Sequence, residues 1–144
     1  MRENRATLII PDPDIPKGST LRIMEALKNA INWFEIPALD FDRAVRFYGE
    51  IYGREMPTRD MGHLKMAFFS HEQGQVGGTV VSGDGYQPSK NGPKLYLNCG
   101  ADLLTVLDRV EAAGGTVVMG KTAISPEVGF FAIIDDTEGN RVYL

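Results

Sequence analysis

The chain has 144 residues, of which 43% are hydrophobic and 24% are charged, and its formal net charge is -4. A chain of this length buries roughly 70% of the surface that its unfolded form exposes, which suits one compact domain. The acidic balance, without a dense run of Lys or Arg, argues against a nucleic-acid groove, because phosphate binding needs a concentrated basic face. We therefore expect a small organic molecule or a second copy of the chain as partner, with no nucleic acid and no membrane.

The N-terminal part of the chain differs from the rest. Residues 1–29 contain Pro11, Pro13 and Pro16 after a short apolar run, and we interpret them as an N-terminal extension to a domain over residues 30–144. The start of the chain lacks the basic and then apolar pattern of a signal peptide, and the single Cys99 cannot form an internal disulfide. These features predict a cytoplasmic protein.

The first predicted module covers residues 30–82. Alternation over residues 31–36 predicts a strand, because side chains two apart share a face. A helix follows, with Asp40 as its N-cap, Leu39 as a hydrophobic staple and Gly53 as its left-handed exit. Its apolar stripe comprises Phe41, Ala44, Val45, Tyr48 and Ile51. Three extended stretches over residues 55–59, 63–70 and 75–82 complete the module.

The second predicted module covers residues 94–144 and repeats the same order after a turn-rich linker over residues 83–93. Residues 94–99 form its first predicted strand, and Gly114-Gly115 ends its helix. The inner stripe of that helix comprises Leu103, Leu104, Val106, Leu107 and Val110. The last three predicted strands cover residues 116–119, 128–135 and 140–144.

Four segments carry a resemblance to a known family. They are WFEIPALDFDRAVRFYGEIYG, VGGTVVSGDGYQPSKNGPKLYLNC, VEAAGGTVV and FFAIIDDTEGNRVYL. Over residues 31–144 the chain resembles the vicinal oxygen chelate superfamily of glyoxalases, bleomycin-resistance proteins and extradiol dioxygenases. The resemblance implies an α+β fold of two tandem βαβββ modules, which form a U-shaped curled sheet with helices outside and a ligand cavity inside. It also implies a homodimer, sometimes formed by pairing modules between chains.

Alternation along the strands predicts which side chains face that cavity, because each helix must cover the apolar face of its own sheet. The predicted ligand-binding residues are Trp33, Glu35, Lys94, Tyr96, Asn98, Arg141 and Tyr143. The residues predicted to face the helices are Phe34, Ile36, Leu95, Leu97, Cys99, Val142 and Leu144. On that side Cys99 is interpreted as a buried apolar side chain and not as a nucleophile.

The resemblance also locates the family's metal ligands. Metal-dependent members place one His, Gln or Glu on the first and last strand of each module. The corresponding residues here are Trp33, Gly78, Lys94 (or Leu95 after a slip in register) and Tyr143. None of these is a usual ligand of the family, since Gly has no side chain and the indole and ammonium groups only donate hydrogen bonds. His63 and His71 lie eight residues apart, or roughly 26 Å along one strand. The sequence therefore predicts no metal and no cofactor.

Several side chains have two interpretations. Glu35 is either a general base in a partly apolar cavity or a structural carboxylate paired with Lys94 or Arg141. Trp33 and Tyr96 either stack on a planar ligand or fill the space of a lost metal site.

Three functional hypotheses follow. The first is a metal-free glyoxalase/bleomycin-resistance-like protein that binds a small organic molecule in the sheet cavity. The alternative is a glyoxalase-like lyase or isomerase, either metal-dependent or using Glu35 without metal. The third is a structural or interaction role through a dimer surface.

Overall fold

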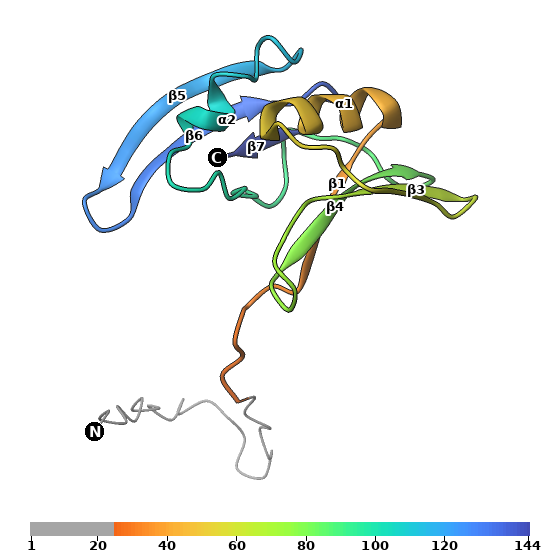
Figure 1. The fold of residues 1–144 in the computed structure, drawn as a ribbon, viewed down its shortest axis with the longest axis horizontal. Helices are drawn as coiled ribbons and strands as arrows, with labels where there is room; N and C mark the ends of the chain where they lie inside the picture. Colours follow the sequence, from red (N-terminus) through yellow and green to blue (C-terminus); the bar gives the residue numbers. More distant parts are fainter. Residues whose placement is uncertain (1–24) are drawn as a thin grey trace, which may run out of the picture.

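A computed structural model describes residues 25–144, so most of the predicted N-terminal extension lies outside the described residues. The fold is α+β, as predicted, with two sheets and two helices in this part of the chain. Neither helix is long and apolar enough to cross a membrane. The two sheets lie side by side, and α1 runs along them (Figure 1).

Sheet A has the strand order β1-β4-β3-β2. Its strands are β1 (Trp33–Pro37), β2 (Thr58–Asp60), β3 (Leu64–Phe68) and β4 (Gly77–Gly83). The pairing of β1 with β4 is parallel, and the other two pairings are antiparallel. A parallel pairing needs a crossover connection, and here that connection contains α1 (Phe41–Tyr52).

Helix α1 forms where its sequence predicts. The Asp40 side chain accepts a hydrogen bond from the backbone amide of Arg43 at 3.0 Å, and Gly53 ends the helix at φ 61°. Phe47 is fully buried and belongs to the inner stripe, from which the prediction omitted it. The predicted staple is wrong, because Leu39 is 62% exposed and a staple residue has to be buried against the first turn of the helix.

Sheet B has the strand order β5-β6-β7, with both pairings antiparallel. Its strands are β5 (Thr116–Ser125), β6 (Gly129–Asp135) and β7 (Arg141–Tyr143). In place of the strand predicted over residues 94–99, a single parallel bridge joins Tyr96 to Tyr143. Tyr143 donates its backbone amide to Leu95 O at 2.9 Å and accepts the backbone amide of Leu97 at 2.8 Å.

The second helix is shorter than predicted. Helix α2 covers only Leu104–Leu107, and turns continue the segment to Gly114. Leu103 begins the helix without a side-chain cap, so the first turn lacks the stabilisation that Asp40 gives α1. The predicted stripe nevertheless faces the core, since Leu103, Val106 and Val110 are buried. Two complete tandem modules and one curled sheet are therefore not confirmed, whereas the two-sheet α+β arrangement is.

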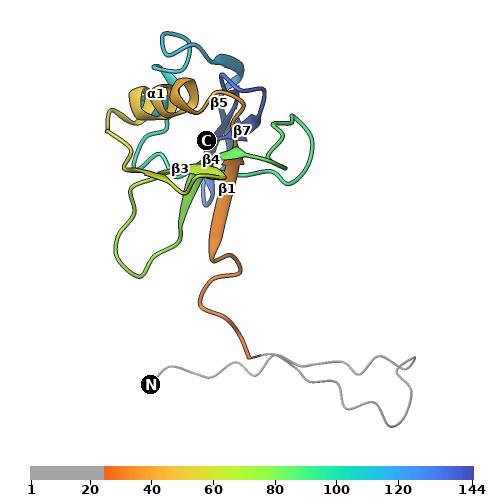
Figure 2. The same ribbon diagram turned by 90° about the vertical axis from the view of Figure 1, so that its right-hand side faces the viewer.

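One hydrophobic core joins the two sheets through α1. It contains Ala44, Phe47, Tyr48 and Ile51 of α1 together with buried residues of sheet A, sheet B and α2. Figure 2 shows α1 over sheet A with sheet B beside it. We call the helix-free face of each sheet, on the far side from this core, its open face.

A polar cluster connects the β6–β7 turn to α1, and we call it the polar node (Arg43, Tyr48, Asp136, Glu138 and Asn140); all of its members except Arg43 are buried. Asp136 accepts hydrogen bonds from the Tyr48 hydroxyl at 2.7 Å and from Asn140 Nδ2 at 2.8 Å. It also accepts the backbone amides of Glu138 at 2.8 Å and Asn140 at 2.9 Å. The carboxylate of Asp136 is thus fully satisfied by groups from both halves of the chain.

Glu138 makes the second connection of the polar node. It accepts the Arg43 guanidinium at 2.7 Å and the backbone amide of Asp40 at 2.7 Å, so it holds the start of α1. Asn140 Nδ2 donates to Pro37 O at 2.7 Å, which holds the end of β1. The closing D-x-E-G-N pattern therefore fixes the turn of sheet B against the β1–α1 junction of sheet A.

Removing the Tyr48 hydroxyl tests the polar node. We expect Tyr48→Phe to lower the free energy of unfolding by about 1–3 kcal/mol, because it takes a partner from a buried carboxylate. Urea unfolding followed by far-UV circular dichroism measures the change. Tyr86→Phe is the matched control, since it removes an exposed tyrosine hydroxyl bond and should cost within about 0.5 kcal/mol. Equal losses for the two variants would contradict a special role for the node.

Acid should destabilise the protein through two carboxylates. Burial of Glu138 would raise its pKa, but the hydrogen bonds from Arg43, the Asp40 amide and Thr137 outweigh burial and lower the pKa. The hydrogen bonds from Arg141 likewise lower the pKa of Asp135. Each folded pKa lies below its unfolded value, so this stabilisation is complete above about pH 5 and is lost as the pH falls further.

The measurement is the urea midpoint between pH 7 and pH 3. Glu138→Gln should lower stability at pH 7 and flatten the acid limb of the profile, whereas Glu50→Gln, on the exposed side of α1, should leave that limb unchanged. An acid limb as steep in Glu138→Gln as in the unaltered chain would count against this assignment.

Candidate functional site: the open sheet faces and the cavity between the sheets

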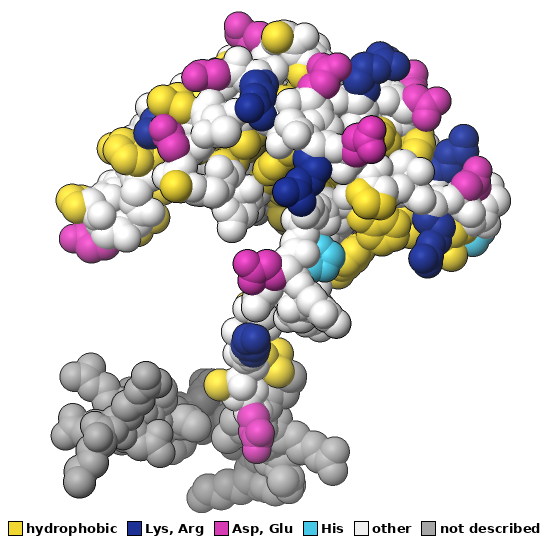
Figure 3. Space-filling model, in the orientation of Figure 1, with side chains coloured by type: hydrophobic (Ala, Val, Ile, Leu, Met, Phe, Trp, Pro, Cys, Tyr) yellow, Lys and Arg dark blue, Asp and Glu magenta, His cyan; other side chains and the backbone are white. Residues whose placement is uncertain are grey.

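The open face of sheet A carries two of the predicted ligand-binding residues. Phe34 and Ile36 pack into the core, so Trp33 and Glu35 lie on the other face of β1, as predicted. The Trp33 ring is 39% exposed and its centroid lies 6.2 Å from that of Phe68. Figure 3 views the molecule from the α1 side and not from this face, and hydrophobic side chains also gather there beside β3 and β4. This face therefore offers an aromatic surface next to a carboxylate.

The open face of sheet B carries the aromatic and cationic residues. Tyr96 is 57% exposed, and its ring lies 4.8 Å from that of Tyr143. The Lys94 ammonium lies 5.8 Å from the centre of the Tyr143 ring, within the range of a cation–π contact. Arg141 forms a two-point hydrogen bond with Asp135, at 2.8 and 3.1 Å, which leaves less of its charge for a ligand.

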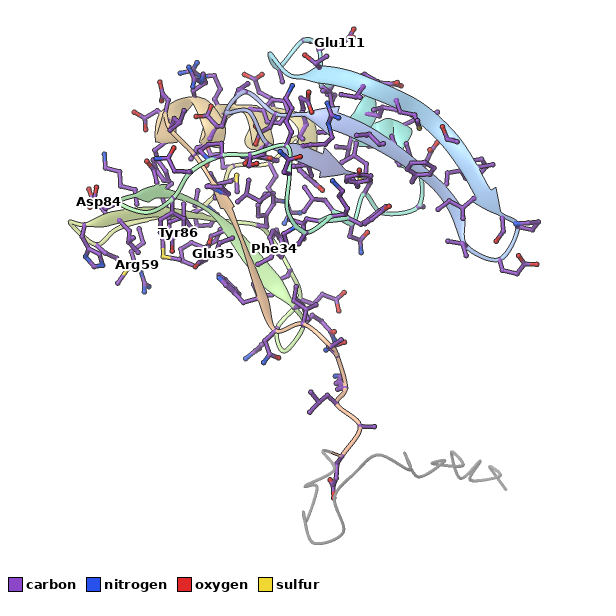
Figure 4. The ribbon with its side chains drawn as sticks, turned by 180° about the vertical axis from the view of Figure 1, so that it is seen from behind. Phe34, Glu35, Arg59, Asp84, Tyr86 and Glu111 are labelled. Carbon is purple, nitrogen blue, oxygen red and sulfur yellow. The ribbon has the colours of Figure 1, made fainter. Side chains whose placement is uncertain are left out.

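Glu35 has a partner that the sequence did not indicate. The Tyr86 hydroxyl, from the linker between the modules, donates to the Glu35 carboxylate at 2.7 Å. This hydrogen bond raises the pKa of Tyr86. Figure 4 shows the two side chains next to each other. The predicted pairing of Glu35 with Lys94 or Arg141 is therefore wrong, because the linker folds back over sheet A and reaches Glu35 first.

The seven predicted residues do not meet in one cavity. A cavity of about 700 Å³ lies instead on the helix side, between α1, sheet A and residues 95–100, and we call it the junction cavity. Tyr96 and Asn98 contribute to its lining, whereas Trp33, Glu35, Lys94, Arg141 and Tyr143 do not. Its walls include Phe34, Leu95 and Leu97, which alternation assigned to the helix side, together with Phe68 and His71, which pack against Trp33. No sequence signal showed that these side chains leave a space between the two sheets.

The predicted metal position at Gly78 is displaced by one residue. A Cβ on Gly78 would lie 2.4 Å from the Phe34 ring, so position 78 faces the helix side. On the open face Thr79 pairs with Glu35, as Tyr143 pairs with Tyr96. A slip of one residue moves a side chain to the opposite face. Thr79 therefore corresponds to Tyr143, and its buried hydroxyl has no hydrogen-bond partner among the described residues.

The corrected positions do not suit the family's metal. Trp33 and Lys94 supply no acceptor, and hydroxyls of Thr79 and Tyr143 are poor substitutes for imidazole or carboxylate ligands. Within residues 25–144 no three His, Cys, Asp or Glu side chains gather closely enough to hold an ion. His71 packs against Trp33 on the open face of sheet A, with 6.5 Å between ring centroids, whereas His63 lies outside the opposite end of β3, so the two imidazoles do not form a shared donor set.

Comparison with known proteins agrees with the two-sheet fold. The model of the Glyoxalase/Bleomycin resistance protein/Dioxygenase superfamily matches residues 30–144. The chain belongs to this superfamily. A glyoxylase-like domain-containing protein from Didymella fabae is 30% identical over 122 residues, which cover 79% of this chain and 91% of that protein.

Solved structures support the same fold. A glyoxalase/bleomycin resistance protein from Streptomyces sp. CB03234 has a TM-score of 0.61 at 22% identity, over 78% of this chain and 96% of that one. A glyoxalase-related enzyme from Fulvimarina pelagi has a TM-score of 0.57 at 18% identity, over 81% and 86%. Glyoxalase I from Zea mays has a TM-score of 0.53 at 16% identity, and the match covers 78% of this chain but only 44% of the maize enzyme.

The orientation of position 78 can be tested by substitution. Gly78→Ala should destabilise the superfamily fold by about 1–3 kcal/mol, because the new methyl group must displace the Phe34 ring. Gly120→Ala is the matched control, since nothing lies within 4 Å of its Cβ and its φ is not positive. Thermal and urea unfolding measure both variants. A Gly78→Ala protein as stable as Gly120→Ala would place position 78 on the open face instead.

Proposed function

We propose that this superfamily member binds a planar small organic molecule between open sheet faces, without the family's metal. Within one chain Trp33 and Glu35 of one open face share no cavity with Lys94 and Tyr143 of the other. The site is completed in a homodimer, where sheet A of one copy faces sheet B of its partner. The observation that carries this proposal is the exposure of Trp33 and Tyr96 beside charged groups on these faces.

The side chains on the two faces suit a planar ligand. Trp33 on one face and the Tyr96–Tyr143 pair on the other supply flat surfaces for stacking. Lys94 supplies a positive charge and Glu35 a negative one, so polar groups of the ligand are recognised at the edges. Such a site binds and orients a molecule through stacking and hydrogen bonds. We place it in the cytoplasm, where the unpaired thiol of Cys99 stays reduced.

A lyase or isomerase activity is the second candidate, supported by the single carboxylate on an aromatic face. In that case Glu35 accepts a proton from the substrate, and the Tyr86 hydroxyl must move or share its hydrogen bond during binding. Tyr86→Phe would then change the pH profile of turnover, whereas simple ligand binding predicts no turnover to change.

The only tryptophan of the chain makes the proposal testable by fluorescence. Planar aromatic compounds that raise the melting temperature should also quench Trp33, because they stack on it. Tyr143→Ala should weaken this binding about tenfold through the loss of one stacking surface, and Val128→Ala, at the exposed far end of sheet B, should not. Light scattering should give a dimer. A monomer that still quenches Trp33 with full affinity would contradict the shared site.

Elemental analysis of protein purified without chelator tests the metal-free part of the proposal. We expect less than about 0.1 equivalent of Ni, Zn, Fe or Mn, because the corrected positions offer no suitable donor set. One equivalent of any of these ions, removed by chelator with a fall in melting temperature, would contradict it.

A further inference from the structure

We propose that the junction cavity is a second small-molecule site, which binds an aromatic molecule with one anionic group and does not include Trp33 or Tyr143. Its lining is built mainly around α1 and residues 95–100, and although Phe68, His71 and Tyr96 reach it from the open faces, neither Trp33 nor Tyr143 lines it. The inference therefore goes beyond the proposed function and does not depend on it.

The size and the walls of the junction cavity suit an aromatic body. Its volume of about 700 Å³ lies within the range of roughly 300–1,000 Å³ that is usual for ligand sites. Phe34 of β1 and Phe69, which directly follows β3, form one wall, and Leu95 and Leu97 form the other wall. Phe34 and Phe69 lie 5.5 Å apart, ring to ring, so they present a continuous aromatic surface. Both walls are fixed by the core and need little rearrangement on binding.

Two neutral donors lie among these walls. The Tyr52 hydroxyl donates to Asn98 O at 3.2 Å, and the Cys99 thiol donates to Leu97 O at 3.5 Å. Burial raises the pKa of Tyr52 and the pKa of Cys99, so both side chains stay uncharged at neutral pH. The interior of the cavity is therefore uncharged and favours the apolar part of a ligand.

The charge at the mouth of the cavity favours an anion. Arg54 Nη1 is held by Ser70 Oγ at 2.7 Å, and Arg109 Nη1 lies 3.4 Å from Ile51 O at the end of α1. Both guanidinium groups are thus positioned by neutral oxygens, and neither forms a salt bridge with any residue between 25 and 144. They are available for a carboxylate or sulfonate.

Two acidic residues at the mouth limit the charge of the ligand. Glu55 and Glu72 also line the junction cavity and repel anions. A single negative group that contacts both arginines gains attraction from each, whereas a second negative group would lie beside Glu55 and Glu72 with no cation of its own. The cavity therefore selects a monoanion with an aromatic body.

The only cysteine of the chain reports on this cavity. The probe is 1-anilinonaphthalene-8-sulfonate, an aromatic monoanion, added to the full chain. Bound probe should slow alkylation of Cys99 by iodoacetamide at least about fivefold, because it covers the thiol. Arg109→Gln should weaken binding about five- to tenfold, since one charge-assisted hydrogen bond is lost. Glu55→Gln, the matched control at the same mouth, should leave binding unchanged or strengthen it.

A further variant separates this site from the open faces. Met56→Trp should fill part of the cavity and abolish both the probe fluorescence and the protection of Cys99, whereas Tyr143→Ala should change neither. If Met56→Trp fails to fold, Arg109→Gln still tests the proposal, because the Arg109 side chain is exposed and its replacement should not prevent folding. Two results would overturn the proposal. One is probe fluorescence without slower alkylation of Cys99. The other is protection of Cys99 that is lost in Tyr143→Ala but kept in Arg109→Gln. Quenching of Trp33 by the planar compounds of the proposed open-face site is expected whichever of these results is obtained.

Discussion

The hydrogen bond between the Tyr48 hydroxyl and Asp136 couples the two halves of the molecule, and the rest of the arrangement depends on it. Both groups are buried, so each would lose several hydrogen bonds to water on folding if it had no protein partner. A hydrogen-bond network offsets this loss, and in it Asn140 and Glu138 bind backbone groups near the start of α1. Such a network accepts one geometry, so the turn between β6 and β7 sets how sheet B lies against α1.

This coupling decides where binding surfaces can occur. Because the polar node draws the helix sides of both sheets towards α1, the aromatic residues on the open faces remain outside the shared core. The same contact leaves a space where α1 ends and residues 95–100 have only one bridge to β7. A longer strand and a longer second helix would fill that space with backbone and side chains. The irregular second half of the chain therefore accounts for both the open faces and the junction cavity.

Local patterns predicted the parts of the fold that depend on local physics. The cap at Asp40, the exit at Gly53 and the alternation that separates Phe34 from Glu35 all follow from neighbouring residues. Position 78 could not be assigned in this way, because Gly77 and Gly78 have no side chains to show which face each occupies, and only pairing with β1 fixes it. The contact between Glu35 and Tyr86 joins residues 51 positions apart and depends on the path of the linker. Periodicity contains no information about such a contact.

The residue types at the four family positions change the chemistry that an open-face site can perform. A divalent ion would polarise a substrate oxygen, and this requires several nitrogen or oxygen ligands in one place. An indole, a threonine hydroxyl, an ammonium group and a phenol can instead stack, donate hydrogen bonds and supply one positive charge. In the proposed site such groups would hold a planar molecule, and Glu35 is the carboxylate placed to remove a proton from it. Since Tyr86 already donates to that carboxylate, a base at this position first has to release its own hydrogen bond, and this supports the binding proposal over the catalytic one.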